Sequence, residues 1–233
     1  MRLVLLDMDG TVLMGRSLRA LAQAFDLEEE LAALDREKQQ RGLSEREVAH
    51  RIAGLFAGLS LRDLYRVFDL IPLTPGACPW IRDQQRRGRV VALVSDSWRP
   101  LVERLAARLG VDEVWANGLE VESGQLTGVL LPPPCPADLP PDCQRHAVCK
   151  LHALRSLAEK YGVEPGEILA VGDGPVDVCM LREAGLGVAL NPKTHEVAQA
   201  ADIVVFGDFY DLARAVEAKE ARDAQGSGSR IIS

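Results

Sequence analysis

Short apolar runs that end abruptly in polar residues recur along this chain. Continuous runs of this kind are typical of strands buried on both faces of a parallel sheet. Apolar residues at helical spacing lie between them, and strands that alternate with helices predict an α/β fold with a Rossmann-like, mostly parallel sheet. Strands are predicted at residues 3–6, 90–94, 114–116, 168–171, 188–189 and 203–205, and helices over 80–87, 100–109, 150–161 and 178–184.

A long helical stretch interrupts this alternation after the first strand. From Arg16 to Phe68, apolar residues recur at helical spacing among charged ones, and Pro72 and Pro75 close the stretch. We therefore expect a small helical unit, residues 14–73, inserted into a main domain made of residues 1–13 and 74–218.

Two other segments carry few signs of regular helix. The stretch from Leu131 to Cys143 is rich in proline, which cannot continue a helix or a central strand, so it is predicted to be a surface loop that follows a hairpin near residues 122–125. The last residues, 219–233, include Gly and Ser in alternation and are predicted to form a flexible tail.

Composition narrows the range of partners. The net charge is −7, whereas nucleic-acid binding through counterion release needs a concentrated Lys/Arg surface, so nucleic acid is not an expected partner. The first residues leave no room for a signal peptide, and no apolar run approaches the ~20 residues that span a bilayer. We expect a cytoplasmic protein with no membrane partner, and five cysteines, an odd number, predict no disulfide framework. Monomer and homodimer both stay open.

Acidic residues follow the predicted strands in a pattern that suits metal chemistry. Asp7 and Asp9 lie two apart at the end of the first strand, so their side chains project to the same side, and Gly10 lets the backbone turn. Asp173 and Asp177 follow the strand at 168–171. Because ligands bind beyond the carboxyl ends of parallel strands, we expect these carboxylates to meet at one edge of the sheet.

Four motifs in order resemble those of the haloacid dehalogenase superfamily. Asp7-Met8-Asp9-Gly10-Thr11 is similar to its DxDGT signature, Val94-Ser95 to its second motif, Lys150 to its third, and the stretch from Gly172 to Asp177 to its fourth. The resemblance covers residues 1–210. It implies a haloacid dehalogenase-like core in which residues 14–73 form a C1 cap, a lid that excludes water and selects the substrate.

The resemblance also implies a Mg²⁺-dependent phosphatase acting through an aspartyl-phosphate intermediate. Asp7 would be the nucleophile, and Asp9 the general acid and base. The carboxylates of Asp7 and Asp173 and the Asp9 carbonyl would hold Mg²⁺, with Asp177 as a further ligand or a support behind the ligands.

Three other residues would bind the phosphate in such an enzyme. Thr11, Ser95 and Lys150 are expected to contact the phosphoryl oxygens, where negative charge is spread in the transition state. A catalytically idle binding protein is the remaining alternative, and the intact motifs disfavour it.

Within the superfamily, the chain looks most like the phosphoserine phosphatase branch. Arg51 fits the position of an arginine that binds the substrate carboxylate there, whereas Arg16 stands where that branch usually has a glutamate. Asp96 replaces a glycine and could pair with a substrate ammonium group or cap the next helix. A similar Ser-Asp pair occurs in phosphoethanolamine/phosphocholine phosphatases and in phosphoserine:homoserine phosphotransferases, which are the alternatives for this small phosphorylated metabolite.

The spacing of the cysteines raises the question of a second metal ion. The spacing of Cys135, Cys143 and Cys149 is similar to that of a cysteine cluster in the phosphoethanolamine/phosphocholine group, where Cys179 also has a counterpart. Zn²⁺ with His146 or His152 as a fourth ligand, and ordinary thiols, are both compatible with this spacing.

Overall fold

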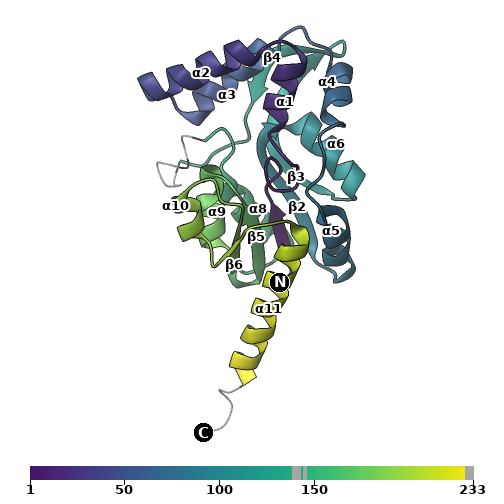
Figure 1. The fold of residues 1–233 in the computed structure, drawn as a ribbon, viewed down its shortest axis with the longest axis vertical. Helices are drawn as coiled ribbons and strands as arrows, with labels where there is room; N and C mark the ends of the chain where they lie inside the picture. The colour runs from purple at the N-terminus through teal and green to yellow at the C-terminus, as the bar shows by residue number, and fades with distance from the viewer. Residues whose placement is uncertain (138–142, 144–145, 229–233) are drawn as a thin grey trace.

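The computed structural model describes residues 1–137, 143 and 146–228. Within them, a seven-stranded sheet has the order β4-β3-β2-β1-β5-β6-β7 (Figure 1). All neighbouring strands are parallel except β3 and β4, which form an antiparallel hairpin. The strands are β1 Leu3–Leu6, β2 Val90–Trp98, β3 Glu113–Glu122, β4 Gln125–Leu131, β5 Ile168–Gly172, β6 Leu186–Leu190 and β7 Ile203–Val205. The predicted α/β class is therefore confirmed.

Helices cover both faces of the sheet because successive side chains of each strand point to opposite sides. Leu3 and Leu5 of β1 pack in one core with α8, α9 and α10, whereas Val4 and Leu6 pack in a second core with α5, α6 and α11. These helices are α5 Ala77–Arg86, α6 Arg99–Leu109, α8 Lys150–Tyr161, α9 Val178–Glu183, α10 His195–Ala200 and α11 Phe209–Gly228. Short 3-10 turns at Pro165–Glu167 and Pro175–Asp177 flank β5.

The stretch predicted to be helical after the first strand folds into four helices beyond the carboxyl edge of the sheet, at the top of Figure 1. Gly42 and Gly58, both with positive φ, lie in the breaks between helices, and Ser44 begins α3 with a capping box to Glu47. The four helices are α1 Ser17–Ala24, α2 Glu28–Arg41, α3 Glu45–Leu55 and α4 Leu61–Phe68.

The tip of the β3–β4 hairpin packs against these inserted helices. The Gly58 N–H donates to the Leu126 carbonyl at 2.7 Å, and the Leu126 N–H donates to the Leu59 carbonyl at 2.9 Å. The sequence predicted the hairpin itself but not this contact, because it joins segments more than sixty residues apart. The inserted helices are thus tied to the sheet by backbone hydrogen bonds as well as by the chain connections.

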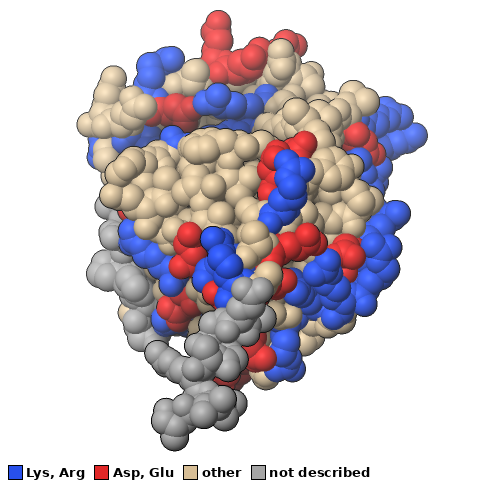
Figure 2. All heavy atoms as spheres, turned by 60° about the horizontal axis from the view of Figure 1, so that its bottom comes forward, with Lys and Arg blue, Asp and Glu red and all other residues tan. Residues whose placement is uncertain are grey.

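The C-terminal helix is longer than the sequence suggested. Residues 219–228 continue α11 where a flexible tail was predicted. Two ion pairs stabilise this part of the helix: Lys219 with Asp223 one turn further along, and Glu220 with Arg89, the residue before β2. Residues 229–233 of the predicted tail, and 138–142 and 144–145 of the region around the predicted proline-rich loop, lie outside the described residues. Acidic and basic side chains interleave over this end of the molecule (Figure 2).

None of the described helices combines the length and the apolar character needed to cross a membrane.

We expect the hairpin contact to be sensitive to a single methyl group. Gly128 has φ of +86°, and a Cβ there would lie 3.0 Å from the Ala57 Cβ and 3.2 Å from the Gly54 Cα. Gly128→Ala should therefore lower the free energy of unfolding by at least about 1 kcal/mol more than Gly124→Ala, since Gly124 has a similar φ but open space around it. Urea unfolding of both variants measures the difference, and equal losses would contradict the packing described here.

Candidate active site

Three neighbouring strands deliver polar residues to the same edge of the sheet. Leu6 of β1 is in register with Leu93 of β2 and with Val171 of β5, and the Asp7 N–H donates to the Val171 carbonyl at 3.0 Å. The residues that follow, among them Asp7, Ser95 and Asp173, therefore leave the sheet side by side. This is the convergence that the strand-end pattern predicted.

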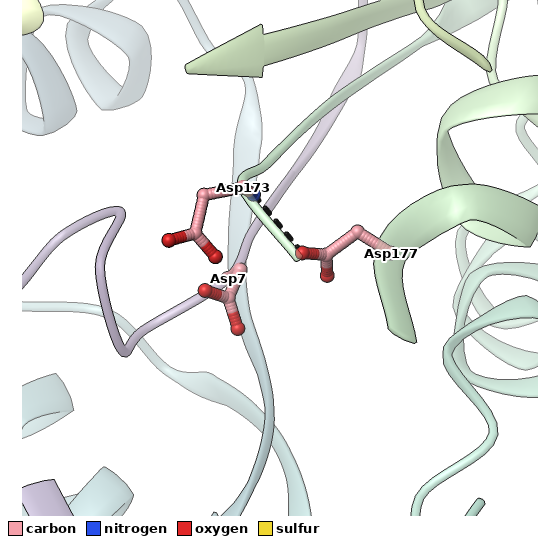
Figure 3. A group of neighbouring side chains, drawn as sticks. All are labelled: Asp7, Asp173 and Asp177. Carbon is pink, nitrogen blue, oxygen red and sulfur yellow. Dashed lines mark hydrogen bonds between the residues drawn. The ribbon is translucent and has the colours of Figure 1, made fainter. Parts of the chain in front are cut away.

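A cluster of buried carboxylates lies at this edge. One carboxylate oxygen each from Asp7, Asp173 and Asp177 lie within 4.8 Å of one another, and all three side chains are buried. Figure 3 shows the carboxylates of Asp7 and Asp173 side by side, with Asp177 directed toward them from the start of the next helical turn. Asp177 Oδ2 accepts the N–H groups of Asp173 and Gly174 at 3.0 and 2.9 Å, which fixes the turn after β5.

Two lysines offset part of this negative charge. Lys150 Nζ lies 2.5 Å from Asp7 Oδ1 and 2.6 Å from Asp177 Oδ1, and Lys193 Nζ lies 2.5 Å from Asp173 Oδ2. Burial opposes the charged form of Lys150, but Asp177 and Asp7 outweigh it, so the pKa of the Lys150 ammonium lies above its ordinary value. Three carboxylates against two ammonium groups leave one negative charge uncompensated.

Burial also changes the pKa values of the carboxyl groups themselves. Burial raises the pKa of Asp7 well above its ordinary value, although Lys150 acts in the opposite direction. Burial also raises the pKa of Asp173, against the effect of Lys193. Two lysines do not neutralise three carboxylates, and carboxylate oxygens are the hard ligands that Mg²⁺ prefers, so the residues fit this ion.

Gly10 makes room for the cluster. Its φ is +90°, and a Cβ at this position would lie 2.1 Å from Asp173 Oδ2 and 2.9 Å from Lys193 Nζ. Only glycine therefore allows the chain after Asp7 to pass this close to the carboxylate of Asp173.

Asp9 stands apart from the three clustered carboxylates, and its own carboxylate is held by the start of α1. The Ser17 N–H donates to Asp9 Oδ1 at 3.0 Å, and the Ser17 hydroxyl donates to Oδ2 at 2.7 Å. Burial raises the pKa of Asp9 to about 6, although the hydrogen bonds from Ser17 favour the charged form. A carboxyl group with such a pKa can both release and accept a proton near neutral pH.

The predicted phosphate ligands Thr11 and Ser95 are fully buried close to these strand ends. The Thr11 hydroxyl has no hydrogen-bond partner within the described structure, whereas Ser95 Oγ accepts the Ser97 N–H at 3.1 Å. A buried hydroxyl without a partner is unfavourable, and neither Thr11 nor Ser95 lines the cavity described next.

A cavity of about 320 Å³ opens between the carboxylates and the inserted helices. Asp7, Asp9 and Asp173 line its floor, and Arg16 and Asp96, both predicted to bind substrate, line its wall. The helix that follows Asp96 begins without a side-chain cap, so the structure does not use Asp96 as the helix cap considered from the sequence.

The structure places the third predicted substrate ligand elsewhere. Arg51 does not line this cavity, and its Nη1 lies 2.8 Å from Glu37 Oε2 on α2. The role of Arg51 in substrate binding stays a prediction. Its pairing with Glu37 was not foreseen, because the spacing of residues along a helix does not reveal which acidic residue a neighbouring helix presents.

Several residues of the site were missed by the sequence analysis. Lys193 lies three residues after β6, so the strand-end pattern could have found it, whereas nothing near Ser17 in the sequence signals its bonds to Asp9. Four charged residues of the cavity wall were also missed: Arg19, Asp35, Lys38 and Glu45. His146, considered from the sequence only as a zinc ligand, lines the same cavity.

The comparisons with known proteins agree with this geometry. Residues 4–182 match the haloacid dehalogenase-like hydrolase family, and this chain belongs to that family. It is 31% identical over 192 residues to a phosphoserine phosphatase of Archaeoglobus fulgidus, covering 82% of this chain and 53% of the relative. It is 35% identical over 201 residues to phosphoserine phosphatase SerB2 of Mycobacterium tuberculosis, covering 85% and 47%. The chain thus spans about half the length of these two relatives.

The fold is also similar to that of solved structures. A phosphoserine phosphatase determined as a phospho-aspartyl intermediate analogue is similar with a TM-score of 0.76 and 27% identity, covering 92% of this chain and 98% of that one. The fold predicted from the four motifs, a haloacid dehalogenase-like α/β core, is therefore confirmed.

The bridge from Lys150 should be essential for the stability of the metal-free protein. Lys150→Met leaves Asp7 and Asp177 buried without their cation, and breaking a buried pair from one side lowers the free energy of unfolding by about 3–5 kcal/mol. Lys160→Met is the control, because Lys160 pairs with Glu113 at the surface and its loss should change little. Thermal and urea unfolding in EDTA compare the two, and equal effects would show that the buried bridge contributes nothing.

Proposed function

We propose that this chain is a Mg²⁺-dependent phosphomonoester hydrolase that acts through an aspartyl-phosphate on Asp7, most like a phosphoserine phosphatase. The single observation that carries this proposal is the cluster of buried carboxylates from Asp7, Asp173 and Asp177, bridged by Lys150. The similarity to relatives named phosphoserine phosphatases supports it.

In the first step, an oxygen of the Asp7 carboxylate attacks phosphorus, and the bond from phosphorus to the ester oxygen breaks. Asp9 donates its proton to that oxygen as the alcohol leaves. In the second step, Asp9 takes a proton from water as the water oxygen attacks phosphorus, and the acyl-phosphate bond breaks to release phosphate and restore Asp7. Two hydrogen bonds from Ser17 orient the Asp9 carboxyl group, whose pKa is about 6. Both features suit a group that acts first as an acid and then as a base.

We assign Mg²⁺ to the carboxylates of Asp7 and Asp173 and the carbonyl of Asp9. A bound Mg²⁺ would supply positive charge between the anionic nucleophile and the anionic phosphate. Asp177 supports the site without binding the ion directly, since its oxygens already accept hydrogen bonds from Lys150 and from two backbone N–H groups. Lys150, Thr11 and Ser95 bind the phosphoryl oxygens.

The inserted helices, residues 14–73, act as the cap over this site and select the substrate. The cavity wall carries both signs of charge, with Arg16, Arg19 and Lys38 near Asp96 and Glu45. A small phosphomonoester that bears an ammonium and a carboxylate group, such as phosphoserine, matches this wall. We assign the substrate ammonium to Asp96 and the substrate carboxylate to Arg16.

One observation favours a second candidate. Arg51 pairs with Glu37 and does not line the cavity, whereas Asp96 lines the cavity and its side chain is exposed. A phosphorylated amine without a carboxylate, such as phosphoethanolamine or phosphocholine, would use Asp96 alone. Transfer of the phosphoryl group to homoserine instead of water is a further variant of the same chemistry.

Replacing the nucleophile tests the mechanism. Asp7→Asn should lower Mg²⁺-dependent phosphate release at least about a thousand-fold, because an amide cannot replace the carboxylate as the nucleophile. Asp63→Asn, a surface change on α4, is the matched control and should leave the rate unchanged. Acid-quenched wild-type protein should carry one phosphoryl group on the peptide that contains Asp7, and turnover that survives in Asp7→Asn would refute the proposed nucleophile.

A substrate panel with wall variants tests specificity. Arg16→Ala should raise the KM for phosphoserine about tenfold to a hundredfold, because this substrate has a carboxylate. The KM for phosphoethanolamine, which has no carboxylate, should not change. Asp96→Asn should raise both KM values, and Arg51→Ala should change neither. Phosphate release is measured for each substrate with and without homoserine. A large effect of Arg51→Ala together with a silent Arg16→Ala would reverse the assignment of the carboxylate ligand.

A further inference from the structure

The end of β2 carries a buried serine to which the proposed function assigns no role. This residue, Ser97, lies two positions after Ser95, and both side chains are buried whereas Asp96 between them is exposed. The alternation is that of a strand, in which residues two apart project to the same side. The side-chain amide of Asn117 on β3 donates to the Asp96 carbonyl at 2.6 Å and holds this part of β2 in place.

Ser97 contacts two residues of the site. Its N–H donates to Ser95 Oγ at 3.1 Å, and its own Oγ lies 3.0 Å from Ser17 Oγ. Ser17 in turn binds Asp9 twice, with its N–H at 3.0 Å and its hydroxyl at 2.7 Å. A continuous chain of hydrogen bonds therefore runs from the end of β2 to the carboxylate of Asp9.

The number of available hydrogen atoms fixes the direction of this chain while Asp9 is ionised. Each serine hydroxyl has one hydrogen, and a carboxylate can only accept. The Ser17 hydrogen is directed to Asp9, so the contact between the two serine oxygens needs the hydrogen of Ser97. Ser97 therefore donates to Ser17, and a hydroxyl that accepts a hydrogen bond becomes a stronger donor itself.

We propose that Ser97 is a positioning residue for Asp9 and acts through the hydroxyl of Ser17. This inference rests on the proposed function, in which Asp9 protonates the leaving alcohol. The Ser17 N–H fixes one carboxylate oxygen, whereas the Ser17 hydroxyl would be free to rotate away from the other if Ser97 did not hold it. Ser97 thus keeps both oxygens of Asp9 in the orientation that proton transfer requires.

The surroundings shield this link from water. Ser17 and Ser97 are 0% and 1% exposed. Trp98, the next residue, is also buried and packs edge-on against Phe56 at the end of α3, with ring centroids 4.9 Å apart. Hydrogen bonds shielded in this way are stronger than exposed ones, because the local dielectric constant is low. Since Ser17 begins α1, the link also joins the inserted helices to β2.

Substrates with different leaving groups test this role, with kcat/KM as the measure of the step that forms the aspartyl-phosphate. The alkyl ester phosphoserine needs a proton on its leaving oxygen, whereas p-nitrophenyl phosphate releases a stabilised anion that needs none. Ser97→Ala should lower kcat/KM for phosphoserine about threefold to tenfold, the effect of one buried hydrogen bond, and change kcat/KM for p-nitrophenyl phosphate less than about twofold. Phosphoethanolamine takes the place of phosphoserine if it is turned over faster.

Two further variants serve as controls. Ser97→Thr keeps the hydroxyl and should restore the rate on the alkyl ester. Ser156→Ala should behave as the wild type, because it removes a serine hydroxyl of α8 that contacts His152 and does not belong to this chain of hydrogen bonds. If Ser97→Ala does not fold, Ser97→Cys gives the same comparison, since a thiol is a weak donor of similar size.

A double variant shows whether Ser97 acts through Ser17. Ser17→Ala should cause the same selective loss, and Ser17→Ala with Ser97→Ala should be no slower than Ser17→Ala alone, because Ser97 has nothing to hold once the intermediate hydroxyl is gone. A uniform loss on both substrates, a silent Ser97→Ala or additive losses in the double variant would overturn the proposal.

Asp9→Asn and Asp7→Asn separate this outcome from failure of the proposed function. Asp9→Asn should lose far more activity on the alkyl ester than on p-nitrophenyl phosphate. If it lowers both equally, or if Asp7→Asn stays active, the proposed function is wrong and the role of Ser97 fails with it. A silent Ser97→Ala beside the expected selective loss in Asp9→Asn would refute the positioning role alone.

Discussion

The arrangement of this site follows from the burial of three carboxylates at one edge of a parallel sheet. Like charges this close repel strongly away from water, and a folded chain tolerates them only where cations and hydrogen-bond donors compensate. Here Lys150 joins Asp7 to Asp177, and backbone N–H groups of the turn after β5 hold Asp177. This compensation is incomplete, and the three carboxylates form a group of oxygen atoms that could hold a metal ion.

This constraint explains why the chain brings distant segments to one point. The nucleophile candidate ends the first strand, its lysine begins a helix about 140 residues later, and a glycine must pass beside Asp173 for the cluster to close. The inserted helices then complete the cavity above it. The carboxylates of Asp7, Asp9 and Asp173 thus line one part of the cavity, and Arg16 and Asp96 line another.

The sequence by itself determined the strands, most of the helices and the convergence of Asp7, Asp173 and Asp177, because strand ends follow from short-range apolar patterns and parallel strands end at one edge. The tertiary structure alone decided the ion-pair partner of Arg51, the hydrogen bonds from Ser17 to Asp9 and the packing of the hairpin on α3. Each of these depends on which side chain a distant element presents, and the local spacing of residues carries no information about that.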